Sequence, residues 1–172
     1  MDSDGVRLYH DQALYKAAGG GFTPWHCDQY YWPVDSDKTI TAWIPLQDTP
    51  VDMGALAFSA GSHLIDLGRN LPIGQDSERV IQEKLQALQL PCVNNEFSAG
   101  DVSFHAGWTF HRAEANQTDI PRRAMTVIYI ADGTRLKQPE NANQEADREQ
   151  WCPGAQVGEV IATELNPLLY KK

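Results

Sequence analysis

The sequence lacks any apolar run long enough to cross a bilayer, although hydrophobic residues make up 42% of its 172 positions. Its first residues, MDSDGVRLYH, contain neither the basic segment nor the apolar segment of a secretory signal. These two absences argue against a membrane span and against secretion. We therefore expect a cytoplasmic protein.

Positive charge is also scarce. Lys and Arg number 14 against 23 Asp and Glu, which gives a formal net charge of −9, and no basic stretch with interleaved aromatic residues occurs. Such a surface repels phosphate backbones, so nucleic acid is not an expected partner. The phosphates of an acyl-CoA would likewise find no obvious cluster of basic residues, which favours a small-molecule substrate without them.

Cysteine is rare as well. Cys27, Cys92 and Cys152 are odd in number and widely spaced, which fits neither a disulfide framework nor a zinc site and indicates a reducing compartment. A chain of this length can bury a core without such crosslinks. With no internal repeat or linker, residues 1–172 are expected to form a single domain. The polar stretch 137–149 is interpreted as a solvated tail segment.

Short stretches rich in β-branched and aromatic residues recur along the chain, separated by Gly, Pro, Asn and Asp. They predict eight strands, at 7–16, 23–30, 39–46, 55–59, 92–97, 102–106, 109–115 and 123–130. Eight strands of this length favour a mainly β jelly roll, the double-stranded β-helix architecture that cupins also have.

One helix is expected, as an insert between the fourth and fifth strands. It covers 76–90, with Ile81, Leu85 and Leu88 on one face, Asp76 as its cap and Pro91 as its stop. We expect this helix to cover the barrel.

A possible metal site comes from His26 and Asp28 in TPWHCDQYYWP, with a histidine, His111, far downstream. Residues at i and i+2 of a strand point to the same face, so His26 and Asp28 can hold one ion together. Two imidazoles and one carboxylate leave open positions on an octahedral ion, as in non-haem Fe(II) oxygenases. From these residues alone, histidines that are only hydrogen-bonded locally remain an alternative.

The last expected strand places Arg122, Ala124 and Thr126 on one face. Small neighbours leave room beside the guanidinium for a dicarboxylate, which Arg can meet with two parallel hydrogen bonds. An exposed arginine at a strand end is equally compatible with these residues.

Two other expected strands contribute polar rows. Trp43 shares a face with threonines, which suggests that it lines a pocket, although a core tryptophan is an alternative. On the first strand His10, Gln12 and Lys16 lie on one side and either line a cavity mouth or face water.

Segments along nearly the whole chain, in a fixed order, together resemble the phytanoyl-CoA dioxygenase family. They are HDQALYK, GGGFTPWHCDQYYWP, TITAWIPLQD, MGALAFSAGSH, GDVSFHAGWTFHRAEANQT and PRRAMTVIYIADG. Two positions depart from the family pattern: Cys27 stands where a Gln commonly separates the ligands, and Ala60 replaces the usual Pro of a turn. Neither departure removes a ligand.

The resemblance implies a specific set of site residues. His26, Asp28 and His111 would bind iron, and Arg122 would anchor the carboxylate of 2-oxoglutarate. The remaining expected cosubstrate-pocket residues are Gln12, Trp43 and Thr126. The family pattern puts no ligand at His105, and His63 closes a Gly-Ser turn, so neither is expected to bind metal.

The resemblance also implies an activity. It is an Fe(II)- and 2-oxoglutarate-dependent dioxygenase that uses O2 to hydroxylate an unactivated C–H bond of a small organic or lipid-like substrate, with release of succinate and CO2. Halogenation is disfavoured, because halogenating relatives lack the carboxylate that Asp28 supplies.

Two alternatives stay open: a cupin-like metal-binding or isomerase module, and a truncated, inactive family member that acts as a scaffold. Family members usually carry a partly helical segment before the first strand, and that segment is apparently absent here. Its absence would leave an apolar face exposed and favour a homo-oligomer.

Overall fold

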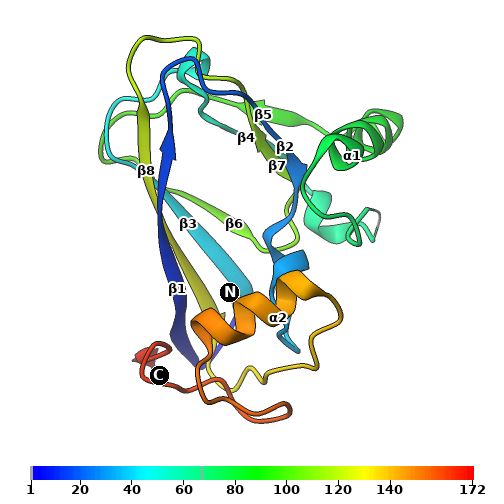
Figure 1. Ribbon diagram of the computed structural model, residues 1–172, viewed down its shortest axis with the longest axis vertical. Coiled ribbons are helices and arrows are strands. Elements are labelled where there is room, and N and C mark those ends of the chain that lie inside the picture. Colours follow the sequence, from blue (N-terminus) through cyan, green and yellow to red (C-terminus); the bar gives the residue numbers. More distant parts are fainter. Residues whose placement is uncertain (1, 67) are drawn as a thin grey trace.

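Two antiparallel sheets form the body of the protein in the computed structural model, which describes residues 2–66 and 68–172 (Figure 1). The larger sheet has the strand order β6 (Ser103–Ala106), β3 (Thr39–Pro45), β8 (Arg122–Ala131), β1 (Gly5–Lys16) and β9 (Leu168–Lys171). The smaller has the order β2 (Thr23–His26), β7 (His111–Ala113), β4 (Leu56–Ser59) and β5 (Cys92–Asn94). The expected mainly β, double-stranded β-helix fold is confirmed.

Strand register in the larger sheet decides which side chains meet inside. Side chains alternate between the two faces of a strand, so paired residues form rows across the sheet. Two neighbouring rows face the interior: Gln12, Thr126 and Trp43 in one, and His10, Ile128, Thr41 and His105 in the other. The pocket-facing orientation expected for Trp43 agrees with this register.

Helix α1 (Gln75–Ala87) is the predicted insert between β4 and β5. Ile81 and Leu85 are buried and pack in a cluster with residues of β2 and its surroundings. Leu88 was expected on the same face but is 47% exposed, because the helix ends at Ala87 and Leu88 only caps it. Neither helix in the described part of the chain is long and apolar enough to span a membrane.

The interpretation of 137–149 as a solvated tail is wrong, because helix α2 (Ala142–Trp151) lies there. The Asn141 side chain caps it by accepting a hydrogen bond from the backbone N–H of Gln144 (3.0 Å). The helix has no fully buried residue, so no apolar stripe signalled it. Asn166 attaches its end to β1, donating from Nδ2 to the carbonyls of Tyr9 (2.8 Å) and Trp151 (3.1 Å).

A half-buried carboxyl also joins α2 to β1, since the Tyr9 hydroxyl donates a hydrogen bond to Asp147. Burial, offset only in part by this bond, raises the pKa of Asp147 to about 7. Between about pH 4 and 7 the folded protein keeps a proton that the unfolded chain releases, so ionisation lowers the free energy of unfolding as pH rises through this window.

We therefore expect Asp147→Asn, which keeps the acceptor, to raise the free energy of unfolding at pH 8 by about 1–3 kcal/mol and to change it little at pH 4. Urea unfolding at both pH values measures the difference. Glu149→Gln, on an exposed part of the same helix, is the control. An equal rise in the free energy of unfolding at both pH values would contradict the raised pKa of Asp147.

The outer face of the larger sheet exposes large apolar side chains. By strand alternation Tyr15 and Phe104 point away from the interior, and they are 68% and 66% exposed. Helix α1 contacts β2 and α2 contacts the short helix η1 (Asp28–Tyr31). Self-association through these exposed side chains stays a prediction.

Candidate metal centre

His26 and Asp28 lie close together, but not on one strand. The expected strand at 23–30 ends at His26, and Asp28 begins the 3-10 helix η1. The chain leaves the sheet here because the backbone N–H of Gln29 bonds to the carbonyl of Gly107 (3.0 Å). The His26 Nε2 still lies 3.9 Å from Asp28 Oδ1.

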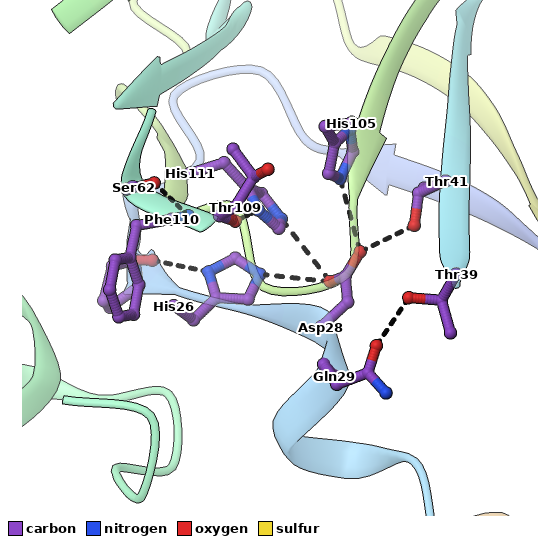
Figure 2. Close-up of polar contacts among 11 residues, drawn as sticks. His26, Asp28, Gln29, Thr39, Thr41, Ser62, His105, Thr109, Phe110 and His111 are labelled. Carbon is purple, nitrogen blue, oxygen red and sulfur yellow. Dashed lines mark hydrogen bonds and ion pairs between the residues drawn. The ribbon is translucent and has the colours of Figure 1, made fainter. Parts of the chain in front are cut away.

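His111 is brought to the same point by strand pairing. It is the first residue of β7 and pairs directly with His26 of β2. Its Nε2 lies 3.5 Å from the same Asp28 Oδ1. A dashed line in Figure 2 joins the two side chains. The three possible ligand atoms lie within 4.8 Å of one another. The three residues expected to bind metal are thus brought together.

Backbone carbonyls fix how the two imidazoles are oriented. His26 Nδ1 lies 2.7 Å from the Pro24 carbonyl, and His111 Nδ1 lies 3.0 Å from the Thr109 carbonyl. A carbonyl only accepts, so Nδ1 carries the hydrogen and the Nε2 lone pair faces Asp28. Burial lowers the pKa of both histidines, that of His111 to about 3, which keeps the rings neutral. Neutral imidazoles with the other nitrogen hydrogen-bonded are the usual state of metal-binding histidines.

The second oxygen of Asp28 is held by two residues that the sequence did not single out for this role. Thr41 Oγ1 donates to Asp28 Oδ2 at 2.9 Å, and His105 Nε2 lies 3.3 Å from it. Burial opposes ionisation of Asp28, but the hydrogen bond from His105 favours the charged form and helps to hold the pKa of this carboxyl below its usual range. Oδ1 is left to face the two histidines. For Thr41, the only signal in the sequence was the polar face that it shares with Trp43.

Arg122 lies at one end of the same interior, together with other buried polar groups. Its Nη1 donates to the carbonyl of Gly54 (2.8 Å), and its guanidinium lies 5.6 Å from the ring of Trp43. Arg122 Nε, Trp43 Nε1 and Thr126 Oγ1 are buried and have no hydrogen-bond partner among the described residues. Buried polar groups are normally satisfied, so this cluster suits a ligand that accepts several hydrogen bonds, such as a carboxylate.

A cavity of about 720 Å³ connects these groups. It is lined by all seven expected site residues: His26, Asp28, His111, Arg122, Gln12, Trp43 and Thr126. His10, Lys16 and His105 also line it, whereas His63 is exposed and is not part of the lining. Lys16 Nζ donates hydrogen bonds to the backbone carbonyls of Gly21 and Glu114, both at 2.8 Å.

Comparison with known proteins decides the family. The family model described as phytanoyl-CoA dioxygenase (PhyH) matches residues 3–124, more than half of the chain. The chain belongs to the phytanoyl-CoA dioxygenase family.

Relatives of this family member include a curated protein from Stutzerimonas stutzeri named probable alpha-ketoglutarate-dependent hypophosphite dioxygenase. It is 26% identical over 132 residues, which cover 74% of this chain and 46% of that protein. Among solved structures, the epimerase SnoN in complex with Fe3+, alpha ketoglutarate and nogalamycin RO is 26% identical with a TM-score of 0.79, covering 96% of this chain and 66% of SnoN.

A second similar structure is the non-heme alpha ketoglutarate dependent carbocyclase SnoK from nogalamycin biosynthesis. It is 30% identical with a TM-score of 0.77, covering 96% of this chain and 63% of SnoK. The chain thus spans about half of the curated relative and just under two thirds of these two structures.

The segment that matches the phytanoyl-CoA dioxygenase model contains the whole cluster around Asp28 and also Arg122. Helix α2, which forms part of the cavity wall, lies beyond it. The family match therefore covers the candidate metal-binding residues of the cavity but not the α2 wall.

Proposed function

We propose that this family member is an Fe(II)- and 2-oxoglutarate-dependent dioxygenase that hydroxylates an unactivated C–H bond of a small substrate. The observation that carries the proposal is the convergence of His26 Nε2 and His111 Nε2 on one oxygen of Asp28, with both Nδ1 atoms held by backbone carbonyls. Two imidazoles and one carboxylate are the donor set of non-haem Fe(II) oxygenases.

The cavity also fits the organic cosubstrate. Arg122, Trp43 and Thr126 would hold the distal carboxylate of 2-oxoglutarate, because each offers a buried donor without a partner in the described chain. Their strand positions put these donors in the same cavity as the three metal-binding candidates. The SnoN complex, which contains Fe3+ and alpha ketoglutarate, supports the same pair of cofactors here.

The residues of this chain would prepare the site in three ways. Thr41 and His105 hold Asp28 Oδ2, so Asp28 offers Oδ1 as a single ligand atom and leaves room for other ligands. The Pro24 and Thr109 carbonyls fix the imidazole rings. Arg122, held by Gly54, orients the cosubstrate and neutralises its carboxylate.

When bound, iron and 2-oxoglutarate would supply the oxidising power that breaks the C–H bond in the presence of O2, with succinate and CO2 as coproducts. Hydroxylation is the outcome we propose among those known for such enzymes, and the similar structures include an epimerase and a carbocyclase. The three cysteines are free, in agreement with the cytoplasmic location we propose.

Anaerobic titration of the protein with Fe(II) and then 2-oxoglutarate tests the proposal. We expect a weak visible charge-transfer band, because the keto acid chelates the iron through two oxygens. Succinate in place of 2-oxoglutarate lacks the keto oxygen and should give no band. Admission of O2 should then convert 2-oxoglutarate to succinate. Iron binding without a band would instead support a cupin-like module, and failure to bind iron would support a scaffold.

A further inference from the structure

The far end of the cavity, next to α2, contains a buried histidine without a protein partner. His10 is only 5% exposed, and in the described chain neither of its ring nitrogens has a hydrogen-bond partner. His10 is one of the residues that line the cavity. Leaving a buried polar group unpaired is unfavourable, so this position suits a ligand that supplies hydrogen bonds.

Aromatic rings, not hydrogen bonds, hold His10 in place. The ring of Trp151, from the end of α2, stacks on it with 4.6 Å between centroids and an interplanar angle of 13°. The ring centroids of Tyr9 and Trp32 lie 5.1 Å and 6.3 Å from that of His10. Packing therefore fixes the imidazole, and a ligand at this end of the cavity would meet a ring that is already held in one orientation.

The position of His10 relative to the metal centre suits a substrate. His10, Ile128, Thr41 and His105 form one row across four strands, and both Thr41 and His105 contact Asp28. Three strand spacings separate His10 from His105, which is about 14 Å. A ring-sized molecule that touches His10 would therefore extend toward the metal-binding oxygen.

Charge at this end of the cavity points to an uncharged ligand. Burial lowers the pKa of His10 to about 4, so the ring is neutral and offers one donor and one acceptor. Helix α2 adds Asn143, Gln150 and Asp147 to the lining, and the Asp147 carboxyl already accepts a hydrogen bond from Tyr9. Lys16 and Arg122, which also line the cavity, pair with each other across β1 and β8. Lys16 is six residues beyond His10 on β1, which places this basic pair about 20 Å from His10. A carboxylate or a phosphate would find no basic side chain among the lining residues of the α2 wall.

We propose that His10 and the cavity side of α2 form the substrate subsite, and that it takes an uncharged, hydroxylated ring compound. Imidazole and amide groups would bind the hydroxyls, while the faces of Trp32 and Trp151 would cover the C–H surface of the ring. The cavity of about 720 Å³ has room for such a ring beside 2-oxoglutarate. The inference rests on the proposed function, because it places this ring beside the iron.

Saturation-transfer NMR on the protein loaded with Zn(II) and 2-oxoglutarate tests the subsite. The probes are methyl β-glucopyranoside and myo-inositol as uncharged hydroxylated rings, and cyclohexanecarboxylate as a charged ring of similar size. We expect transfer to at least one uncharged probe and none to the carboxylate. His10→Phe keeps the ring stacking and removes both nitrogens, so it should weaken probe binding about fivefold or more. His63→Phe, at an exposed histidine, should not change it.

Three outcomes would overturn the inference: no transfer to either uncharged probe, stronger transfer to the carboxylate, or equal binding by wild type and His10→Phe. The charge-transfer band of the wild-type protein with Fe(II) and 2-oxoglutarate is recorded separately. If that band forms and the probes fail, the subsite assignment is wrong and the proposed function stands. If the band is missing, the proposed function itself fails.

Discussion

Replacing His111 with alanine is expected to abolish the charge-transfer band and to lower succinate formation by more than about 100-fold, since loss of a residue that only supports a ligand already costs 10- to 100-fold. His111 supplies one of the two Nε2 atoms that face Asp28 Oδ1, and its ring is buried. Without it, two of the three proposed donors would remain, and they would hold a metal only weakly. Visible spectroscopy under anaerobic conditions and a succinate assay measure the two effects.

His63→Ala is the matched control for this prediction, because His63 is exposed and does not line the cavity. It should keep both the band and the turnover. Circular dichroism of the His111→Ala protein separates loss of metal from loss of fold. A folded His111→Ala protein with an undiminished band and turnover would show that the ligands are assigned incorrectly.

The second large effect is expected for Arg122→Lys, which should raise the apparent KM for 2-oxoglutarate by about 10- to 100-fold, as the loss of charge-assisted hydrogen bonds predicts. Lysine keeps the positive charge but cannot form two parallel hydrogen bonds or keep the planar contact with Trp43. Because the change affects cosubstrate binding, kcat should fall much less than kcat/KM.

Arg123→Lys provides the control, since Arg123 is the next residue of β8 but points to the exposed face of the sheet. Initial rates over a range of 2-oxoglutarate concentrations give KM and kcat for each protein. If Arg122→Lys and Arg123→Lys both have the wild-type KM, the cosubstrate is not anchored at Arg122.

The sequence predicted those parts of the site that depend on residue type and strand alternation. Alternation alone placed Trp43 on the polar face of its strand, where the structure has it lining the cavity. Pairing between β2 and β7, which sets His111 against His26, joins segments 85 residues apart and leaves no local signal. That convergence could be expected only through the family resemblance.

Hydrogen bonds between distant segments explain two features that the sequence did not indicate. The strand expected at 23–30 ends early because Gln29 bonds to the Gly107 carbonyl, a partner that no nearby residue indicates. His105 was set aside as a ligand, and its contact with Asp28 Oδ2 depends on the register of β6 against β3. Periodicity gives the face of a strand but not which strand lies beside it.

Helix α2 was missed for a different reason. A helix is recognised in sequence by an apolar stripe, but α2 has no buried residue and is attached through Asp147, Gln144 and Trp151. These contacts are specific polar and ring interactions with distant segments. They give no periodic pattern, so composition alone suggested a solvated segment.

The attachment of α2 has an evolutionary consequence. The groups around Asp28 belong to the two sheets and to η1, whereas the α2 part of the cavity wall comes from one short, continuous stretch near the end of the chain. A few bonds, from Tyr9 and Asn166, tie this stretch to β1. Under the proposed function and subsite, mutations within this stretch would change which molecules bind and leave the proposed metal ligands unchanged. Selectivity and reactivity could then diverge independently, and exchanging this stretch alone would be a direct route to altering the proposed selectivity.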